Sequence, residues 1–364
     1  MMKSDRDYMN RALQLAMKGK GKTSPNPLVG AVIVKKNRII AEGWHKRAGG
    51  DHAEIMALKN AGARAKGAAL YVTLEPCHHF GRTPPCVDAV KNSGIKKVVI
   101  GMKDPNPLTN GKSISQLRRA GIKVKVGVLA KELKEINEVF LKYIRSKRPF
   151  VAAKTAQTLD GKIAAANGHS QWITSKAARD YARRARDEFD AILVGTNTVI
   201  RDNPRLQGVH KRLKKIVVDT QLRTPARARL FHHTPADDCF LATSRKAPKR
   251  KVEYFRKRGV HVLACPLRRG KVDLNWLLKN LAKREITSIL IEGGANVIGS
   301  ALQQKLVDKM YIYIAPKFIG DQSALSSVFG LKVNNVNKAI RLKDINLKHI
   351  GTDILLSGYV YRNR

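Results

Sequence analysis

The sequence is poor in cysteine and has no long apolar run. Four cysteines in 364 residues are too few for a disulfide framework, so a close pair is more typical of metal binding or catalysis. Cys239 and Cys265 stand alone and are expected to be small buried residues. No stretch approaches the ~18 apolar residues that a membrane-spanning helix needs. The N-terminus also lacks the pattern of a secretory signal, so we expect a cytoplasmic protein without a membrane segment.

Acidic and aromatic residues are scarce as well. The chain has 28 Asp and Glu against 70 Lys and Arg, a formal net charge of +42. Such a charge favours a nucleic-acid partner. However, the basic residues are scattered, the densest runs at 211–215 and 246–251 are short, and aromatics make up only 6%. We therefore disfavour nucleic acid and favour a general bias of the proteome toward Lys and Arg; a phosphorylated substrate would benefit from part of this field but would not need all of it.

The first part of the chain alternates between strand and helix patterns. Short apolar runs are separated by stretches of helical periodicity, some of which end at glycine. This alternation predicts one sheet with helices on both faces, a three-layer α/β/α domain. The expected strands are 28–34, 38–44, 69–74, 96–101 and 122–128; the expected helices are 52–62, 87–94, 113–121 and 131–144, after an amphipathic helix near the N-terminus.

A charged, proline-bearing joint at 145–150 predicts a domain boundary, which divides the chain into 1–147 and 148–364. The second part alternates again and predicts a mostly parallel α/β sheet with an antiparallel tail. Its main strand candidates are 190–195, 214–219, 239–243, 260–265, 288–294 and 309–316.

The stretch LEPCHHFGRTPPC at 74–86 holds four potential metal ligands. Upstream, His52 and Glu54 form the pattern H-A-E, and with Cys77 and Cys86 they match the H-x-E…P-C…C signature of zinc deaminases. One imidazole and two thiolates leave a fourth zinc position for water, whose pKa the metal lowers. A carboxylate must then move protons to the substrate, a role that suits Glu54. Side chains two residues apart on a helix point in directions that differ by roughly 200°. His52 and Glu54 are therefore not expected to bind the same metal ion.

Two other interpretations of this cluster exist. His78 or His79 could complete a closed structural zinc site, or the cluster could be buried without metal. Neither alternative requires the H-A-E motif, which therefore favours a catalytic site with His52, Cys77 and Cys86 as ligands. Eight residues separate the cysteines, instead of the two in the general signature.

This longer spacing carries a family resemblance. The segments SPNPLVGAVIV, GWHKRAGGDHAEIMAL, YVTLEPCHHFGRTPPC and GMKDPNP resemble the pyrimidine deaminase domain of riboflavin biosynthesis, which is cytidine-deaminase-like. The resemblance implies Zn²⁺, and it implies that Asn26 holds the pyrimidine while Arg82, Asp104 and Asn106 lie by the ribose phosphate. One departure is Ser113, where the family has glycine.

The second part resembles the reductase domain that accompanies this deaminase, a dihydrofolate-reductase-like α/β domain. The matching segments are KTAQTLDGKIA, GHSQWITS, ILVGTNTVIRDNPRL, ILIEGGANVIGSAL and YIYIAPKFIG. The resemblance implies an NADPH site lined by Ala156, Trp172, Thr198, Asp202, Thr220, Gly294, Ala295, Asn296, Val297, Ile298, Gly299 and Ser300. It also implies substrate contacts from Lys154, Ser170, Thr174, Arg186, Leu206 and Glu292.

Some questions stay open at this point. Asp202 or Glu292 could assist protonation during reduction. The family arginine that meets the substrate phosphate is replaced by Val209, for which Lys211 or Arg212 could substitute.

We expect a bifunctional riboflavin-biosynthesis enzyme that forms a homo-oligomer. It would deaminate 2,5-diamino-6-ribosylamino-4(3H)-pyrimidinone 5′-phosphate, and NADPH would then reduce the ribosyl group, giving 5-amino-6-(5-phosphoribitylamino)uracil. The rivals are a polynucleotide deaminase and a non-catalytic NADPH-binding regulator with a structural zinc.

Overall fold

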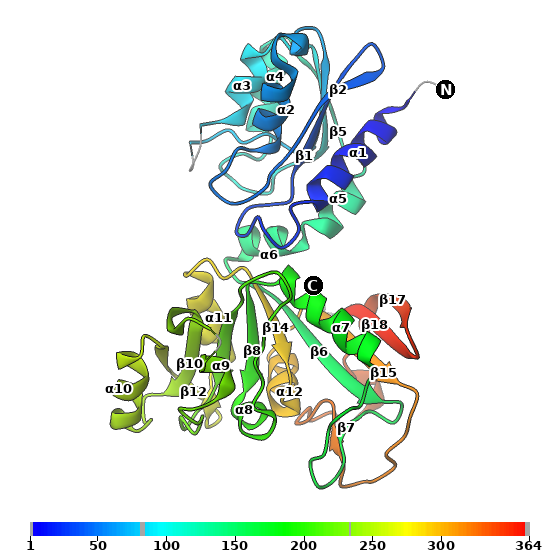
Figure 1. The fold of residues 1–364 in the computed structure, drawn as a ribbon. Coiled ribbons are helices and arrows are strands. Elements are labelled where there is room, and N and C mark those ends of the chain that lie inside the picture. Colours follow the sequence, from blue (N-terminus) through cyan, green and yellow to red (C-terminus); the bar gives the residue numbers. More distant parts are fainter. Residues whose placement is uncertain (1–2, 81–83, 233, 361–364) are drawn as a thin grey trace. The chain divides into compact units, whose positions relative to one another are not determined.

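The computed structural model describes residues 3–80, 84–232 and 234–360. The chain divides into two compact units, Met1–Lys147 and Arg148–Arg364. Each unit is built around its own sheet (Figure 1). The α/β class predicted for both parts is confirmed.

The first unit contains a five-stranded sheet in the order β2-β1-β3-β4-β5. β1 pairs antiparallel with β2 and β3, whereas β3, β4 and β5 run parallel. Lys36 and Asn37, both with positive φ, form the tight turn between β1 and β2. The strands are β1 Gly30–Lys35, β2 Arg38–Trp44, β3 Ala69–Leu74, β4 Lys97–Met102 and β5 Lys123–Val126.

Helices cover both faces of this sheet: α2, α3 and α4 lie on one face, and α1 and α5 on the other (Figure 1). α1 starts with a capping box between Ser4 and Asp7 and buries Met9, Ala12 and Leu15. A Cβ at Gly30 would lie 2.0 Å from the Ala12 carbonyl oxygen, so this close packing of α1 on β1 requires glycine. The helices are α1 Asp5–Met17, α2 Ala53–Ala61, α3 Cys86–Asn92, α4 Lys112–Arg119, α5 Ala130–Ile136 and α6 Glu138–Ser146, with the 3₁₀ turn η1 Gly62–Ala65.

The single helix expected over 131–144 is wrong, because the chain breaks at Asn137 between α5 and α6. The Asn137 side chain is buried and accepts a hydrogen bond from the Leu28 N–H at 2.8 Å. Its amide donates to the Leu28 carbonyl at 3.1 Å and to the Leu133 carbonyl at 3.3 Å. The side chain thus satisfies backbone groups of a distant loop, which helical periodicity alone does not reveal.

The second unit contains a nine-stranded sheet in the order β11-β10-β9-β8-β14-β6-β15-β18-β17. Pairing is parallel from β11 to β15 and antiparallel for β18 and β17, so the predicted antiparallel tail is confirmed. The strands are β6 Phe150–Thr158, β8 Ala191–Gly195, β9 Lys214–Val218, β10 Cys239–Ser244, β11 His261–Cys265, β14 Ser288–Glu292, β15 Lys309–Ala315, β17 Leu342–Ile350 and β18 Asp353–Val360. Two small sheets pair β12 Leu267–Arg268 with β13 Lys271–Val272, and β7 Lys162–Ala164 with β16 Leu325–Ser326.

Alternate residues of the central strands enter different cores. Ala191 and Leu193 of β8 pack with α11 and α12, whereas Ile192 and Val194 pack with Phe255 of α10. Cys239 and Cys265 are both buried, as predicted. The helices are α7 Lys176–Ala185, α8 Thr196–Asp202, α9 Arg229–His232, α10 Lys249–Lys257, α11 Leu274–Ala282 and α12 Ala295–Gln303, with 3₁₀ turns η2 Arg186–Glu188, η3 Ala236–Asp238 and η4 Val336–Lys338.

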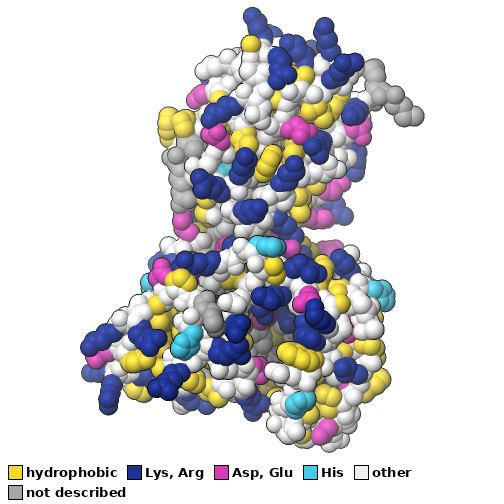
Figure 2. Space-filling view, in the orientation of Figure 1, with side chains coloured by type: hydrophobic (Ala, Val, Ile, Leu, Met, Phe, Trp, Pro, Cys, Tyr) yellow, Lys and Arg dark blue, Asp and Glu magenta, His cyan; other side chains and the backbone are white. Residues whose placement is uncertain are grey.

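The surface carries the basic excess of the sequence. On the face seen in Figure 2, Lys and Arg side chains are spread over both units and are interspersed with other residue types. Within the described ranges, no helix is long and apolar enough to cross a membrane.

Candidate functional site

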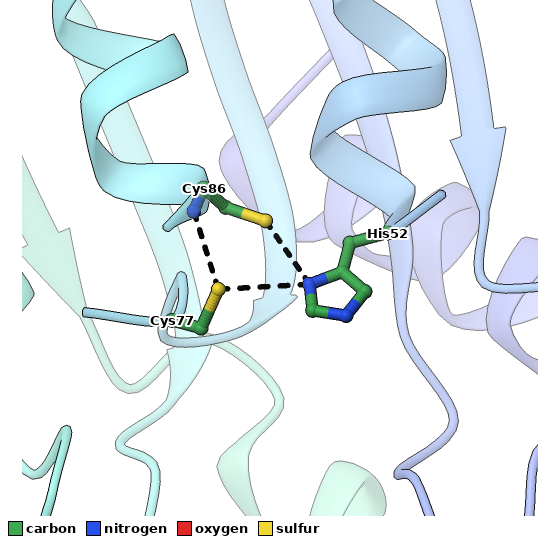
Figure 3. Close-up of side chains that lie close together, drawn as sticks. All are labelled: His52, Cys77 and Cys86. Carbon is green, nitrogen blue, oxygen red and sulfur yellow. Dashed lines mark hydrogen bonds between the residues drawn. The ribbon is translucent and has the colours of Figure 1, made fainter. Parts of the chain in front are cut away.

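Three side chains predicted to bind metal converge in the first unit (Figure 3). His52 precedes α2, Cys77 follows β3 and Cys86 opens α3, so their ligand atoms come from three separate segments. His52 Nδ1 lies 3.1 Å from Cys86 Sγ and 3.6 Å from Cys77 Sγ. All three ligand atoms lie within 4.8 Å of one another.

This spacing fits zinc. With Zn–S near 2.3 Å and Zn–N near 2.0 Å, tetrahedral ligand atoms lie roughly 3.5–3.8 Å apart. Cys77 Sγ accepts a hydrogen bond from the Cys86 backbone N–H at 3.2 Å, at the start of α3. The Cys86 thiol and then His52 lower the pKa of Cys77 to about 4, while the hydrogen bond to Cys77 raises the pKa of Cys86. The backbone N–H at this helix start therefore stabilises the Cys77 thiolate.

Glu54 lies beside the three ligands and outside their cluster. It is 3% exposed, and burial together with the nearby Cys77 raises its pKa to about 7. His52 is the N-cap of α2 with extended backbone (φ −72°, ψ 162°), so the helical rotation argued from the sequence does not apply between these two residues. His52 and Glu54 point to different positions because the backbone turns between the N-cap and the first turn of α2.

The structure also includes residues that the sequence analysis missed. Asn26 Nδ2 lies 3.0 Å from Nε2 of buried His45, whose Nδ1 lies 3.0 Å from the Asp51 carbonyl oxygen. His45 therefore links Asn26 to the segment that carries His52. The imidazole rings of His45 and His52 meet edge to face. His45 directly follows β2, and its local sequence gives no signal, because only the fold brings it to Asn26.

Buried Glu75 organises the loop that carries Asp104 and Asn106. Its carboxylate accepts hydrogen bonds from the backbone N–H groups of Asp104, Gly111 and Ile114 at 3.2, 3.0 and 3.4 Å. Asp104 in turn accepts from the Asn106 N–H at 2.9 Å. Burial raises the pKa of Asp104 to about 6. Glu75 adjoins the P-C motif, which is the one sequence signal that could have identified it.

Three further residues named from the sequence lie near these loops, namely Ser113, His78 and His79. Ser113 is buried and donates to the Pro76 carbonyl at 2.7 Å, so the departure from glycine is accommodated by a hydrogen bond. His79 Nδ1 lies 3.3 Å from Thr109 Oγ1, and His78 lines a neighbouring cavity. Arg82 lies outside the described residues.

The second unit contains a cleft of about 620 Å³, which we call the large cleft. It is lined by the middle of β6, by α8 and by the end of β14, and Gly293 and Gly294 lead from β14 into α12. Both glycines have positive φ, which the turn requires. The predicted residues that line the cleft are Lys154, Ala156, Ser170, Trp172, Thr174, Arg186, Thr198, Asp202, Leu206, Glu292, Gly294, Ala295, Asn296 and Ile298.

A bidentate ion pair joins Arg186 to Glu292 in the large cleft. Arg186 Nε and Nη2 each lie 2.8 Å from a different carboxylate oxygen, and Nη1 donates to the Gln207 carbonyl at 2.8 Å. Although burial opposes it, Arg186 and Lys154 lower the pKa of Glu292. Burial lowers the pKa of Lys154. The Arg186 side chain is only 21% exposed, so it is not a solvated surface arginine.

Asp202 and Trp172 line the same cleft. Asp202 ends α8, and partial burial raises its pKa. The Trp172 ring is 62% exposed, and the Arg179 guanidinium stacks 4.2 Å from its centroid. Trp172 is therefore not a core residue.

A second space of about 350 Å³, which we call the small pocket, adjoins the turn after β9 and the hairpin β12–β13. Thr220, Gly294, Asn296, Val297 and Ser300 from the predicted set line it. Gly299 lines neither space, because it packs on the backbone of Phe329, where a Cβ would lie 1.8 Å from the carbonyl oxygen.

Neither basic residue offered as a substitute at Val209 lines the large cleft. Lys211 Nζ lies 3.0 Å from Asp190, and Arg212 pairs with Asp237 and Asp238. Asp187 accepts hydrogen bonds from the backbone N–H groups of 209, 210 and 211, which holds this loop in place.

Comparisons with known proteins agree with both units. Residues 2–102 match the cytidine and deoxycytidylate deaminase zinc-binding region, and residues 149–356 match the RibD C-terminal domain. The riboflavin biosynthesis protein RibD of Actinobacillus pleuropneumoniae is 45% identical over 98% of this chain and 96% of its own length. That of Escherichia coli is 40% identical over 97% and 98%.

Two solved structures are similar over nearly the whole chain. RibD of Acinetobacter baumannii has a TM-score of 0.89 at 36% identity and covers 100% of both chains. A diaminohydroxyphosphoribosylaminopyrimidine deaminase/5-amino-6-(5-phosphoribosylamino)uracil reductase of Thermotoga maritima has a TM-score of 0.85 at 37% identity and covers 98% and 99%.

Proposed function

The chain belongs to the RibD family of riboflavin biosynthesis proteins, and we propose on this basis how its own residues carry out the two reactions. It is a bifunctional enzyme with a zinc-binding deaminase region followed by a reductase. The observation that carries the assignment of residues is the convergence of His52, Cys77 and Cys86 beside buried Glu54.

In the first reaction, water replaces an amino group of the phosphorylated pyrimidine and ammonia leaves. We propose that His52, Cys77 and Cys86 hold zinc, which when bound acts as a Lewis acid that activates water near neutral pH. The Glu54 carboxylate takes a proton from the attacking water and delivers protons to the ring nitrogen and the departing amine.

Substrate binding in this unit is assigned to loops around the zinc ligands. Asn26, oriented by His45, hydrogen-bonds the pyrimidine. Asp104 and Asn106, on the loop held by Glu75, are assigned to the ribose phosphate. The family resemblance assigns Arg82 to the same group, but this residue lies outside the described ranges.

In the second reaction, the ribosyl group of the deaminated product is reduced. The reductase uses a nicotinamide cofactor, and we propose NADPH, which supplies a hydride when bound. Lys154 and Arg186 orient the sugar in the large cleft, whose lining also includes Ser170, Thr174 and Leu206.

Hydride arrival at the ribosyl C1′ requires a proton for the opened sugar oxygen. Arg186 keeps Glu292 ionised, so Glu292 serves to hold Arg186 and the substrate hydroxyls. We assign the proton to Asp202, which lines the large cleft and whose pKa is raised from its ordinary value by partial burial. A cytoplasmic location and a homo-oligomer remain predictions.

One coupled assay tests both halves. Purified protein is expected to carry about one zinc per chain, to release ammonia from the diaminopyrimidine substrate, and to oxidise NADPH only once that substrate is deaminated. Glu54→Gln should retain zinc and lose ammonia release, yet still reduce deaminated substrate.

The matched control is Glu135→Gln on α5, which replaces an exposed glutamate of the same unit. Glu135→Gln should behave as the unmodified chain does. Normal ammonia release by Glu54→Gln would remove Glu54 from the mechanism, and protein without zinc would remove the ligand assignment.

A further inference from the structure

Two basic side chains from separate segments converge on the small pocket. Arg223 follows the turn after β9, and Lys271 begins β13. Arg223 Nη2 donates to Asn197 Oδ1 at 2.9 Å, which orients the guanidinium. The Val272 N–H donates to Thr220 Oγ1 at 3.3 Å, which ties the hairpin bearing Lys271 to the same turn. Contacts within the fold therefore hold Arg223 and the segment of Lys271 at the small pocket.

The small pocket is continuous with the large cleft. Asn197, Gly294 and Asn296 line both spaces, at the start of α12. A long ligand whose reacting end lies near Lys154 and Glu292 can therefore pass over the start of α12 and place its other end between Arg223 and Lys271. A dinucleotide has this form, with a pyrophosphate between its two nucleosides.

We propose that Arg223 and Lys271 bind the 2′-phosphate of the adenosine ribose and thereby select NADPH over NADH. The two cofactors differ only in this phosphate, so a discriminating contact must lie at the adenosine end. Paired cations suit a dianionic phosphate, and arginine can bind it through two parallel N–H groups. The inference rests on the proposed reductase function and extends it to the choice of cofactor.

Asp219 is the one acidic residue among those lining the small pocket, and its charge opposes a phosphate. Its Oδ2 accepts hydrogen bonds from the Thr224 N–H and hydroxyl, both at 2.6 Å. The residue is 1% exposed, so this carboxylate lies beneath the pocket surface. By contrast, Arg223 and Lys271 are exposed and can reach the ligand. The two cations therefore dominate the field that a phosphate meets there.

The test measures binding of NADP⁺ and NAD⁺ to the full chain by calorimetry, together with the KM for NADPH and NADH. Arg223→Ala and Lys271→Ala should each weaken NADP⁺ binding about 10- to 100-fold, as expected for loss of a charged hydrogen bond. NAD⁺ binding should change little. Urea unfolding of each variant, followed by tryptophan fluorescence, checks that the unit is folded.

Two further variants serve as controls. Arg227→Ala removes an exposed arginine four residues from Arg223 that does not line the small pocket, and it should leave NADP⁺ binding unchanged. Lys271→Arg keeps the positive charge and should keep most of the preference. If Lys271→Arg loses as much as Lys271→Ala, a charge-based role is refuted.

The outcomes separate the possible phosphates. Equal weakening of NADP⁺ and NAD⁺ would assign the cations to the shared pyrophosphate and overturn the inference. The fragment 2′-phosphoadenosine 5′-phosphate should likewise bind more tightly than adenosine 5′-phosphate, and only while Arg223 and Lys271 are present. A wild-type chain that binds both dinucleotides equally overturns this inference alone, whereas one that binds neither also overturns the proposed reductase chemistry.

Discussion

Replacing Arg186 by methionine is expected to destabilise the second unit strongly. The substitution removes both hydrogen bonds to Glu292 and the one to the Gln207 carbonyl, while keeping much of the side-chain volume. Glu292 is only 7% exposed, so its carboxylate would be left buried without its main partner. Breaking one side of a buried pair costs about 3–5 kcal/mol. For a unit of this size that corresponds to a fall in Tm of roughly 6–20 °C.

The loss should also depend on pH. In the unmodified chain, Arg186 and Lys154 hold the pKa of Glu292 below its ordinary value despite burial. Its contribution is therefore fully present above the unfolded pKa and is lost as pH falls through the lowered folded pKa. In Arg186→Met, burial would dominate and raise the folded pKa of Glu292. The destabilisation should therefore be larger at pH 8 than at pH 5, where the buried carboxyl can take up a proton.

Tryptophan fluorescence provides the assay. Of the three tryptophans, Trp44 lies in the first unit, while Trp172 and Trp276 lie in the second. In a Trp44→Phe background, urea unfolding followed by fluorescence reports on the second unit alone. The control is Arg183→Met, which removes an exposed arginine from α7 of the same unit. If both methionine variants lose the same stability, or if the loss at 186 does not change with pH, the ion-pair reasoning is refuted.

Two further predictions concern single polar side chains. Asp202→Asn should lower the reductase kcat about 100-fold or more, as expected for loss of a general acid. It should also abolish the decline in reductase rate as pH rises through the raised pKa of Asp202. An unchanged pH–rate profile contradicts the role of Asp202. Asn137→Ala leaves the Leu28 N–H and carbonyl without their partner, so the first unit should lose about 2–5 kcal/mol. This loss should appear as faster heat inactivation of ammonia release, and equal inactivation rates would show that Asn137 is dispensable.

Much of the fold could be predicted because strands and helices are encoded locally. The alternation of apolar runs indicated both sheets, and the predicted antiparallel tail is present in the second one. The break at Asn137 could not be predicted in the same way, since its cause is a hydrogen bond to Leu28, 109 residues away in sequence. Such a contact exists only once the two segments have folded together.

The metal ligands could be predicted from the sequence for a chemical reason. Few residue types bind zinc, so a histidine and two cysteines at suggestive spacings stand out even when they come from separate elements. Residues that position others have no such signature. His45 and Glu75 act through hydrogen bonds to Asn26 and to the backbone of the 104–114 loop, and many other residue types can act in that way.

The net charge of +42 proves a weak guide to function, because it does not distinguish where a charge is held. Several of the few acidic groups lie in fixed contacts: Asp5 pairs with Lys97 and Lys125, and Glu292 pairs with Arg186. The excess of basic residues lies on the surface, where salt screens each charge within about 8 Å at physiological ionic strength. Such a field can speed the arrival of phosphorylated ligands, but it cannot discriminate between them. Discrimination requires cations fixed at a defined spacing inside a pocket, as Arg186 is by Glu292 and Arg223 by Asn197.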